Sequence, residues 1–217
     1  AKTASRELDL MLTTRDKDKT KSFEEKVPMC GIPYHASDAY IARLIAKGYK
    51  VAICEQTEDP AQAKGLVKRD IIRVITPGTV IDETSLEAGR SNFCAGIWLD
   101  ERYAALCACD ISTGQMSATT FEGPQRLEHL LNELGRFSPA EAVMNDGAFF
   151  DETLTGVLES KFHCHREKWK VPMEAAERLT REQFGEDACA RLPRENPAAV
   201  LALGTLLNYL HETQKTD

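Results

Sequence analysis

Residues 93–121, FCAGIWLDERYAALCACDISTGQMSATTF, decide the fold of the second half of this chain. Three runs rich in apolar and β-branched residues, at 93–99, 103–110 and 115–121, alternate with short polar segments. Short turns between such runs are typical of β-hairpins. The stretch therefore predicts an antiparallel meander of three strands.

A helix and a further strand are expected after the meander. Pro124 opens a predicted helix that continues to residue 137, and leucines recur along it at helical spacing. Residues 141–144 form a short apolar run that predicts a strand. Three hairpin-linked strands, a crossover helix and another strand are the order of a ribonuclease H-like fold. The sequence thus predicts a ribonuclease H-like domain at 92–192, after a linker at 84–91.

The first part of the chain has a different pattern, which predicts a mixed-sheet α/β domain over residues 1–83. Ser37 is expected to cap a helix that ends at Gly48, where a left-handed residue is wanted. The β-branched runs near it predict strands of one mixed sheet. The other expected elements are the end of a helix at 1–8, a strand at 10–14, a mobile charged loop at 16–25, and strands at 49–54 and 71–75.

The last part of the chain is predicted to be helical. Residues 173–184 have the spacing of a short amphipathic helix. Pro197 begins a second helix, over 198–213, that is apolar around more than one face. Such a helix needs neighbours on several sides, which favours a helical bundle. We therefore expect residues 193–217 to belong to a helical bundle.

The composition is that of a soluble protein. The chain has 217 residues, 42% of them hydrophobic, and no apolar run approaches the ~20 residues that a bilayer-spanning helix needs. Its start contains Lys2 and Arg6 and does not resemble a secretory leader. Three of the seven cysteines lie inside apolar runs, which favours reduced thiols over a disulfide framework. The expected location is the cytoplasm, with no membrane partner.

Charge is unevenly divided along the chain. Residues 1–80 carry 14 Lys and Arg against 11 Asp and Glu, whereas residues 81–217 carry 13 against 23. The first part can therefore face phosphate groups, and the second part is acidic. A metal site is not expected, because His163-Cys164-His165 has no second cluster at zinc-ligand spacing.

Residues 28–36, PMCGIPYHA, form a stiff loop with unusually apolar side chains. Two prolines and a glycine restrict its backbone, and Met29, Ile32 and Tyr34 stand where solvent alone favours polar residues. Such a loop is either a connector buried in the core or a surface that contacts a partner.

Three further motifs follow this loop in order, and they are AICEQ at 52–56, Asp59-Pro60, and ITPGT at 75–79. Together with the loop they resemble the amino-terminal mismatch-recognition domain of the bacterial MutS family of DNA mismatch repair proteins. Four matches in order are far more specific than one short motif. The resemblance covers the whole chain and implies an amino-terminal fragment, with a first domain that lacks its opening strand, a connector domain, and the start of a core helix.

The resemblance implies a role in DNA mismatch repair. Full-length members of the family recognise mispaired or looped bases by wedging an aromatic residue into the minor groove, act as ATP-dependent clamps and form homodimers. A mismatched step stacks poorly, so opening it costs less than opening a paired step. By this resemblance, the Phe-x-Glu motif that supplies the wedge is expected to lie before the first residue of this chain. Phe23-Glu24-Glu25 has the same letters but stands in a charged loop.

Catalysis is not expected from this chain. No Gly-x-x-x-x-Gly-Lys-Ser/Thr motif occurs in the sequence, so the loop that cradles ATP phosphates is missing. ATP and Mg belong to the ATPase domain of longer family members, and no cofactor is expected here. Because the clamp segments of those members are also missing, the affinity for DNA is expected to be low and strongly salt-dependent.

The resemblance places candidate DNA contacts along the sugar–phosphate backbone, where contacts hold register without reading sequence. Packing at a helix start is the open alternative for Tyr34 and His35, and a solvated loop charge is the alternative for Arg15. The candidate DNA-binding residues are Thr13, Arg15, Pro33, Tyr34, His35 and Ala36.

Two other functions are considered for the second domain. Ribonuclease H-like folds often host metal-dependent nucleases, in which carboxylates converge on two ions. Asp110 and Glu141 are the candidates for such a site, although Asp110 is more simply a turn residue. The family also implies that the connector docks a MutL-like repair partner. The acidic helix residues available for docking are Glu128, Glu133, Glu174 and Glu177.

Overall fold

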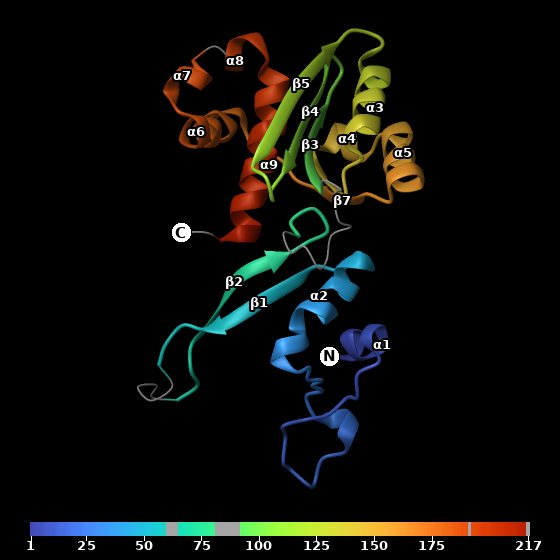
Figure 1. The fold of residues 1–217 in the computed structure, drawn as a ribbon, viewed down its shortest axis with the longest axis vertical. Helices are drawn as coiled ribbons and strands as arrows, with labels where there is room; N and C mark the ends of the chain where they lie inside the picture. Colours follow the sequence, from blue (N-terminus) through green and yellow to red (C-terminus); the bar gives the residue numbers. More distant parts are fainter. Residues whose placement is uncertain (60–64, 81–91, 191, 216–217) are drawn as a thin grey trace.

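The computed structural model describes residues 1–59, 65–80, 92–190 and 192–215. They form two units that follow one another along the long axis of the molecule (Figure 1). The first unit, residues 1–80, has a two-stranded sheet, and the second unit, residues 92–215, has a five-stranded sheet. These two sheets with their helices confirm the predicted α/β class.

The first unit is a small antiparallel hairpin with two helices. Its elements are helix α1 (Lys2–Leu8), the 3₁₀ turns η1 (Phe23–Glu25) and η2 (Tyr34–Ala36), helix α2 (Ser37–Ala46), and strands β1 (Val51–Gln56) and β2 (Arg69–Ile75). The two strands are antiparallel, with Val51 opposite Ile75. The apolar side of α2 packs on this hairpin, where Ile45, Ile75 and Val80 are buried together.

Local geometry in the first unit differs from two of the expectations. The first expected strand is wrong, because only an isolated antiparallel bridge joins Thr13 to Met29 there. Ser37 is not a side-chain cap, since helix α2 begins at Ser37 itself and its hydroxyl donates to the carbonyl of Tyr34 at 2.8 Å. The helix end is confirmed, because Gly48 has a φ of +78°, which glycine adopts without a Cβ clash.

The sheet of the second unit has the strand order β5-β4-β3-β6-β7. Its strands are β3 (Phe93–Leu99), β4 (Tyr103–Asp110), β5 (Gln115–Glu122), β6 (Glu141–Met144) and β7 (His165–Lys168). Strands β3, β4 and β5 form the expected antiparallel meander, and β6 runs parallel to β3. The expected order of meander, crossover helix and parallel strand is therefore present.

Helices cover both faces of this sheet (Figure 1). They are α3 (Arg126–Phe137), α4 (Asp146–Phe149), α5 (Glu152–Phe162), α6 (Met173–Phe184), α7 (Glu186–Cys189), α8 (Leu192–Glu195) and α9 (Pro197–Gln214). On one face, Leu130 and Leu134 of α3 and Leu154 of α5 share a core with Ile97 and Leu106 of the sheet. On the other face, α9 and α6 pack against a second set of strand residues.

Helix α9 lies directly on the sheet. A Cβ at Gly96 of β3 would come within 2.2 Å of the carbonyl oxygen of Ala202, so this close approach requires glycine. A Cβ at Gly204 of α9 would likewise come within 2.4 Å of Ala176 of α6. The expectation that this apolar helix needs a helical bundle is wrong, because the sheet and α6 bury it. The predicted domain boundary at residue 192 stays a prediction.

Helix α5 and strand β7 are not predicted by the sequence pattern. Helix α5 contains threonine and glycine and has little amphipathic contrast, and strand β7 reads His-Arg-Glu-Lys. The residues of β7 have little intrinsic preference for a strand. Their extended conformation comes from pairing with β6. Among the described residues, no helix is long and apolar enough to cross a membrane.

Candidate nucleic-acid interface

The candidate DNA-binding residues come from two neighbouring segments of the first unit. The amide of Thr13 donates to the carbonyl of Met29 at 2.6 Å, and the amide of Met29 donates back to the carbonyl of Thr13 at 2.7 Å. This pair of hydrogen bonds holds the segment of Thr13 and Arg15 beside the start of the 28–36 loop. The bridge lies at Met29, four residues before Pro33, so it fixes the base of the loop.

The tip of the 28–36 loop points into solvent. Pro33 has extended φ and ψ angles and leads into the 3₁₀ turn Tyr34–Ala36. The Tyr34 side chain is 92% exposed, and His35 is exposed as well. Because Tyr34 makes so little contact with the protein, the helix-start packing alternative is wrong for this residue. The buried-connector alternative is also wrong for the tip of the loop.

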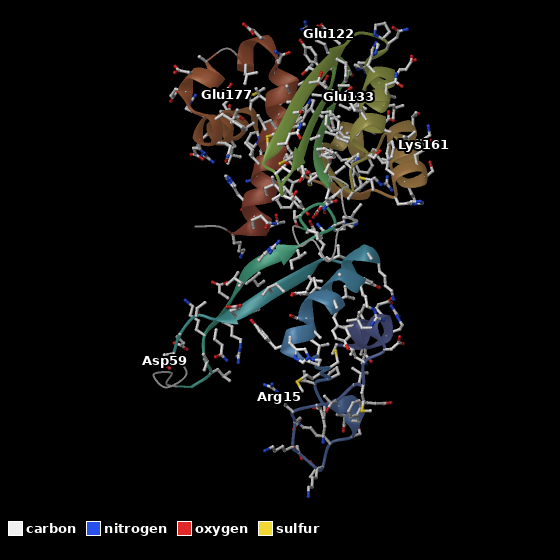
Figure 2. All side chains as sticks on the ribbon, viewed as in Figure 1. Arg15, Asp59, Glu122, Glu133, Lys161 and Glu177 are labelled. Atoms are coloured by element: carbon white, nitrogen blue, oxygen red, sulfur yellow. The ribbon has the colours of Figure 1, made fainter. Side chains whose placement is uncertain are left out.

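Arg15 lies on the outer end of the first unit, far from the second unit (Figure 2). Its side chain is exposed. The adjoining charged loop is held by its own side chains, because Asp18 accepts hydrogen bonds from the hydroxyl and amide of Thr20, at 2.6 Å and 2.9 Å. These two bonds, the hydroxyl bond first, lower the pKa of the Asp18 carboxyl. Lys21 is paired with Asp16 at 3.6 Å, which neutralises part of the local negative charge.

Helix α1 is fastened to helix α2 by one lysine. The ammonium of Lys47 donates to the Glu7 carboxylate at 3.1 Å and to the Glu7 carbonyl at 2.8 Å. The hydrogen bond from Lys47 is the first cause that lowers the pKa of the Glu7 carboxyl. Asp9 then ends the helix in the left-handed region, with a φ of +56°. The chain is thereby directed toward the Thr13 bridge.

The carboxylates considered for a nuclease site do not meet. Paired residues of neighbouring strands point to the same face of a sheet, and successive residues alternate between faces. Asp110 is paired with Phe93, whereas Glu141 is paired with the next residue, Cys94, so the two carboxylates lie on opposite faces. Asp110 accepts hydrogen bonds from the amide and hydroxyl of Ser112, at 3.0 Å and 2.6 Å, as a turn residue does. The nuclease interpretation is therefore wrong for this pair.

The His163-Cys164-His165 segment lines a cleft of about 600 Å³ between the two units. The first unit contributes the end of helix α2 and Pro77 to its walls, and the second unit also contributes Phe149 and the end of helix α5. Burial raises the pKa of the Cys164 thiol to about 12. For His165, burial acts in the opposite direction and lowers the pKa of the imidazole. No group of His, Cys, Asp or Glu within the described ranges has the arrangement of a metal site.

The acidic helix residues do not form one docking patch. Glu133 belongs to α3 and Glu177 to α6, and these helices cover opposite faces of the sheet (Figure 2). Glu133 is also paired with Arg136 at 2.9 Å. A single partner surface therefore cannot use both helices through these residues.

A buried polar cluster around Glu141 was missed by the sequence analysis as a functional feature. The Glu141 side chain is fully buried, and it contacts Thr76 and Gly78 of the ITPGT motif. In the sequence, the ITPGT motif indicates only the family resemblance. The available signal was an acidic residue at the first position of the apolar run 141–144.

The comparisons with known proteins agree with the two units. The family model of MutS domain I matches residues 1–84, and that of MutS domain II matches residues 92–217. Proteins named DNA mismatch repair protein MutS from Acetivibrio thermocellus and Pelotomaculum thermopropionicum are 40% and 45% identical, over 100% and 99% of this chain. The relative of the same name from Symbiobacterium thermophilum is 40% identical over 100% of the chain.

The chain spans 25% of the length of each of these three relatives. The domain II model alone covers more than half of the chain. The order of the two matched models is the order of the two folded units. The chain therefore belongs to the MutS family.

Proposed function

We propose that this chain acts in DNA mismatch repair and that its first unit contacts the sugar–phosphate backbone of mismatched duplex DNA. Relatives along the whole chain carry the name DNA mismatch repair protein. The observation that carries the proposal is the exposed tip of the 28–36 loop, whose base the Thr13–Met29 bridge fastens to the segment that carries Arg15.

The chemistry of these residues suits a backbone contact. The guanidinium of Arg15 can pair with a phosphate, and the ring of Tyr34 can lie along the sugars of a minor groove. Proline restricts the loop before binding, so little conformational entropy is lost on contact. Because backbone contacts do not read bases, this surface positions a duplex, and mismatch selection needs the aromatic wedge of the family.

Binding to short fluorescent duplexes tests this proposal. At about 50 mM salt, the chain should bind heteroduplex and homoduplex with similar, weak affinity that falls steeply as salt rises. Arg15→Ala should weaken both affinities by about three- to tenfold and reduce the salt slope by about one. Tyr34→Ala should also weaken both, with no change in the salt slope.

Lys161→Ala is the matched control, because Lys161 is an exposed lysine on helix α5 of the second unit (Figure 2). It should leave the affinity and the salt slope unchanged. Equal losses in Arg15→Ala and Lys161→Ala would show that binding is a general charge effect, and the proposed interface would be rejected.

The second unit is a candidate docking module for a MutL-like partner. This role is supported by the match to MutS domain II and by strand β5, which forms one edge of the five-stranded sheet. Glu133→Lys and Glu177→Lys change opposite faces of the unit. In a pull-down of a MutL-like protein, the variant that no longer retains the partner identifies the docking face. Retention by both variants would exclude docking through these two helices.

Two further properties of the family remain proposals for this chain. Homodimer formation is implied for full-length members, and sedimentation of the chain at increasing concentration measures it directly. The chain itself is expected to lack ATPase activity, because its sequence has no phosphate-binding loop. Phosphate release above the blank would contradict this expectation.

A further inference from the structure

The two units are joined by a polar cluster, here called the Glu141 cluster and defined as Lys50, Thr76, Gly78, Glu141 and Tyr209. Thr76 and Gly78 lie in the turn after β2, and Lys50 immediately precedes β1. Glu141 is the first residue of β6, and Tyr209 lies on helix α9. The cluster therefore links the first unit to both the sheet and the last helix of the second unit.

Both carboxylate oxygens of Glu141 are occupied. Oε2 accepts hydrogen bonds from the Thr76 hydroxyl at 2.5 Å and from the Gly78 amide at 3.1 Å. Oε1 accepts a hydrogen bond from the Tyr209 hydroxyl at 2.8 Å, and the Lys50 ammonium lies 3.8 Å away. Three of these four contacts come from the first unit, so separating the units would remove most of the partners of Glu141.

The hydrogen bonds around Tyr209 and Lys50 fix which group donates to which. The Tyr209 hydroxyl donates a hydrogen bond to Glu141 and accepts one from the Lys50 ammonium at 3.1 Å. Burial, followed by the Glu141 carboxylate, raises the pKa of Tyr209, and the hydroxyl therefore stays protonated. Lys50 also pairs with Glu167 of β7. Its side chain is 28% exposed and bridges two carboxylates of the second unit.

The turn of the first unit is built to present these donors. The Thr79 amide donates to the Thr76 carbonyl at 3.1 Å, and the Thr79 hydroxyl accepts from the Thr76 amide at 2.9 Å. These two hydrogen bonds hold the conformation of the turn from within the first unit. A Cβ at Gly78 would lie 2.7 Å from the Glu141 Cβ and 3.0 Å from the Cys94 Cβ. Only glycine lets this turn approach the sheet so closely.

Among the described residues, no buried apolar cluster contains residues of both units. The buried cluster of the first unit, around Ile45, Ile75 and Val80, contains no described residue of the second unit. The buried clusters of the second unit contain no described residue of the first. A cleft of about 600 Å³ remains between the units beside the cluster. Two units without a large apolar interface move relative to one another unless specific contacts hold them.

We infer that Glu141 is a positioning residue that fixes the orientation of the first unit on the second through the hydroxyl, amide and ammonium donors of the turn, Lys50 and Tyr209. The inference does not depend on DNA binding, since it concerns the angle between the units. It predicts that the 28–36 loop is held at a defined place relative to the second unit. Loss of the cluster lets the two units move apart or rotate.

Distances between spin labels test this inference. One label is placed on Cys54, which is exposed on β1, and the other on Lys161→Cys of helix α5. Cys30 and Cys189 are replaced by serine. The remaining thiols are buried and should react far more slowly than Cys54 in the native protein. The otherwise unchanged protein should give one narrow distance distribution.

Glu141→Ala, Thr76→Val and Gly78→Ala should each broaden that distribution by about twofold or more, because independent domain motion is the default once the contacts are lost. Tyr209→Phe keeps the ring contact with Trp169 and should broaden it less. Lys50→Gln changes a partly exposed residue outside both cores, so it provides a variant that still folds.

Asp110→Asn is the matched control. Asp110 is also a buried carboxylate of the same sheet, but its bonds to Ser112 are local. It should lower the stability of the second unit and leave the distance distribution narrow. If Thr76→Val, Lys50→Gln and Gly78→Ala fold and keep the narrow distribution of the parent, the inference is overturned and Glu141 is only a core residue. Broadening in Asp110→Asn equal to that in the cluster variants would overturn it too.

Discussion

The two units of this chain differ in how much apolar side chain they bury. Around the hairpin of the first unit, three apolar residues are buried together. In the second unit, the larger of the clusters alone contains 13 buried residues. The first unit also leaves Met11 88% exposed and Leu66 96% exposed. The second unit is therefore stabilised by its core, whereas the first unit depends on turns, single hydrogen bonds and its attachment to the second.

The largest expected effect is on thiol reactivity. Cys54 of the first unit is exposed, whereas Cys107 and Cys109 of β4 are buried. Burial raises the pKa of the Cys109 thiol to about 11, and it also raises the pKa of Cys107. Because the thiolate is the reactive form, Cys54 should react with a disulfide reagent at pH about 8 at least ~1000-fold faster than either.

Mass spectrometry of the labelled chain measures these rates site by site. Addition of urea should bring Cys107 and Cys109 to the rate of Cys54 only when the second unit unfolds. Equal rates in the native protein would show that the second unit opens as easily as the first, which would remove the contrast between them.

The next largest effect is expected from truncating apolar side chains. Leu206 of α9 is completely buried against the sheet, so Leu206→Ala should lower the free energy of unfolding by about 2–5 kcal/mol. Ile53 of β1 is only partly buried, and Ile53→Ala should cost about 1–2 kcal/mol. Urea unfolding followed by circular dichroism measures both. A larger loss in Ile53→Ala would reverse the proposed ranking of the two cores.

The same difference explains which parts of the fold could be predicted from sequence. Strands β3, β4 and β6 are buried on both faces, and their predicted bounds agree with the structure. Strand β7 is polar and lies at the sheet edge, so only its partner reveals it. In the first unit, the segment around Thr13 has strand-like residues, but within the described ranges its only strand-type pairing is the isolated bridge to Met29.

The candidate interface was partly predictable as well. The prolines of the 28–36 loop indicated an unusual backbone, and the structure shows that its tip is exposed. The sequence could not show that Thr13 lies beside Met29, because that contact spans the charged loop between them. It also could not show that Thr76, Glu141 and Tyr209 meet, since these residues are far apart along the chain.

A smaller effect is expected from hydrogen bonds at helix starts. Asn145 is buried before α4, where its side chain accepts from the amides of Leu99 and Ala148 and donates to the Leu99 carbonyl. Asn145→Ala should therefore lower the free energy of unfolding by about 2–3 kcal/mol. Ser37→Ala removes one solvent-accessible bond in the first unit and should cost less than about 1 kcal/mol. Similar losses in the two variants would show that burial does not set the value of these bonds.

The smallest effect is expected from His165, which lies at the start of β7 beside the cleft between the units. Burial is the first cause that lowers the pKa of His165, while Glu141 raises it and Lys50 and Arg166 lower it. The unfolded chain therefore binds a proton more readily than the folded chain. Stability should be complete above the ordinary histidine pKa of about 6.5 and should decrease as the pH falls below it. His165→Gln should make urea unfolding less dependent on pH in this range, whereas His211→Gln, at an exposed position on α9, should not. An unchanged pH dependence in His165→Gln would mean that His165 takes up a proton in the folded protein at no cost in stability. The first unit would then be attached more loosely than the buried contacts of Glu141 imply.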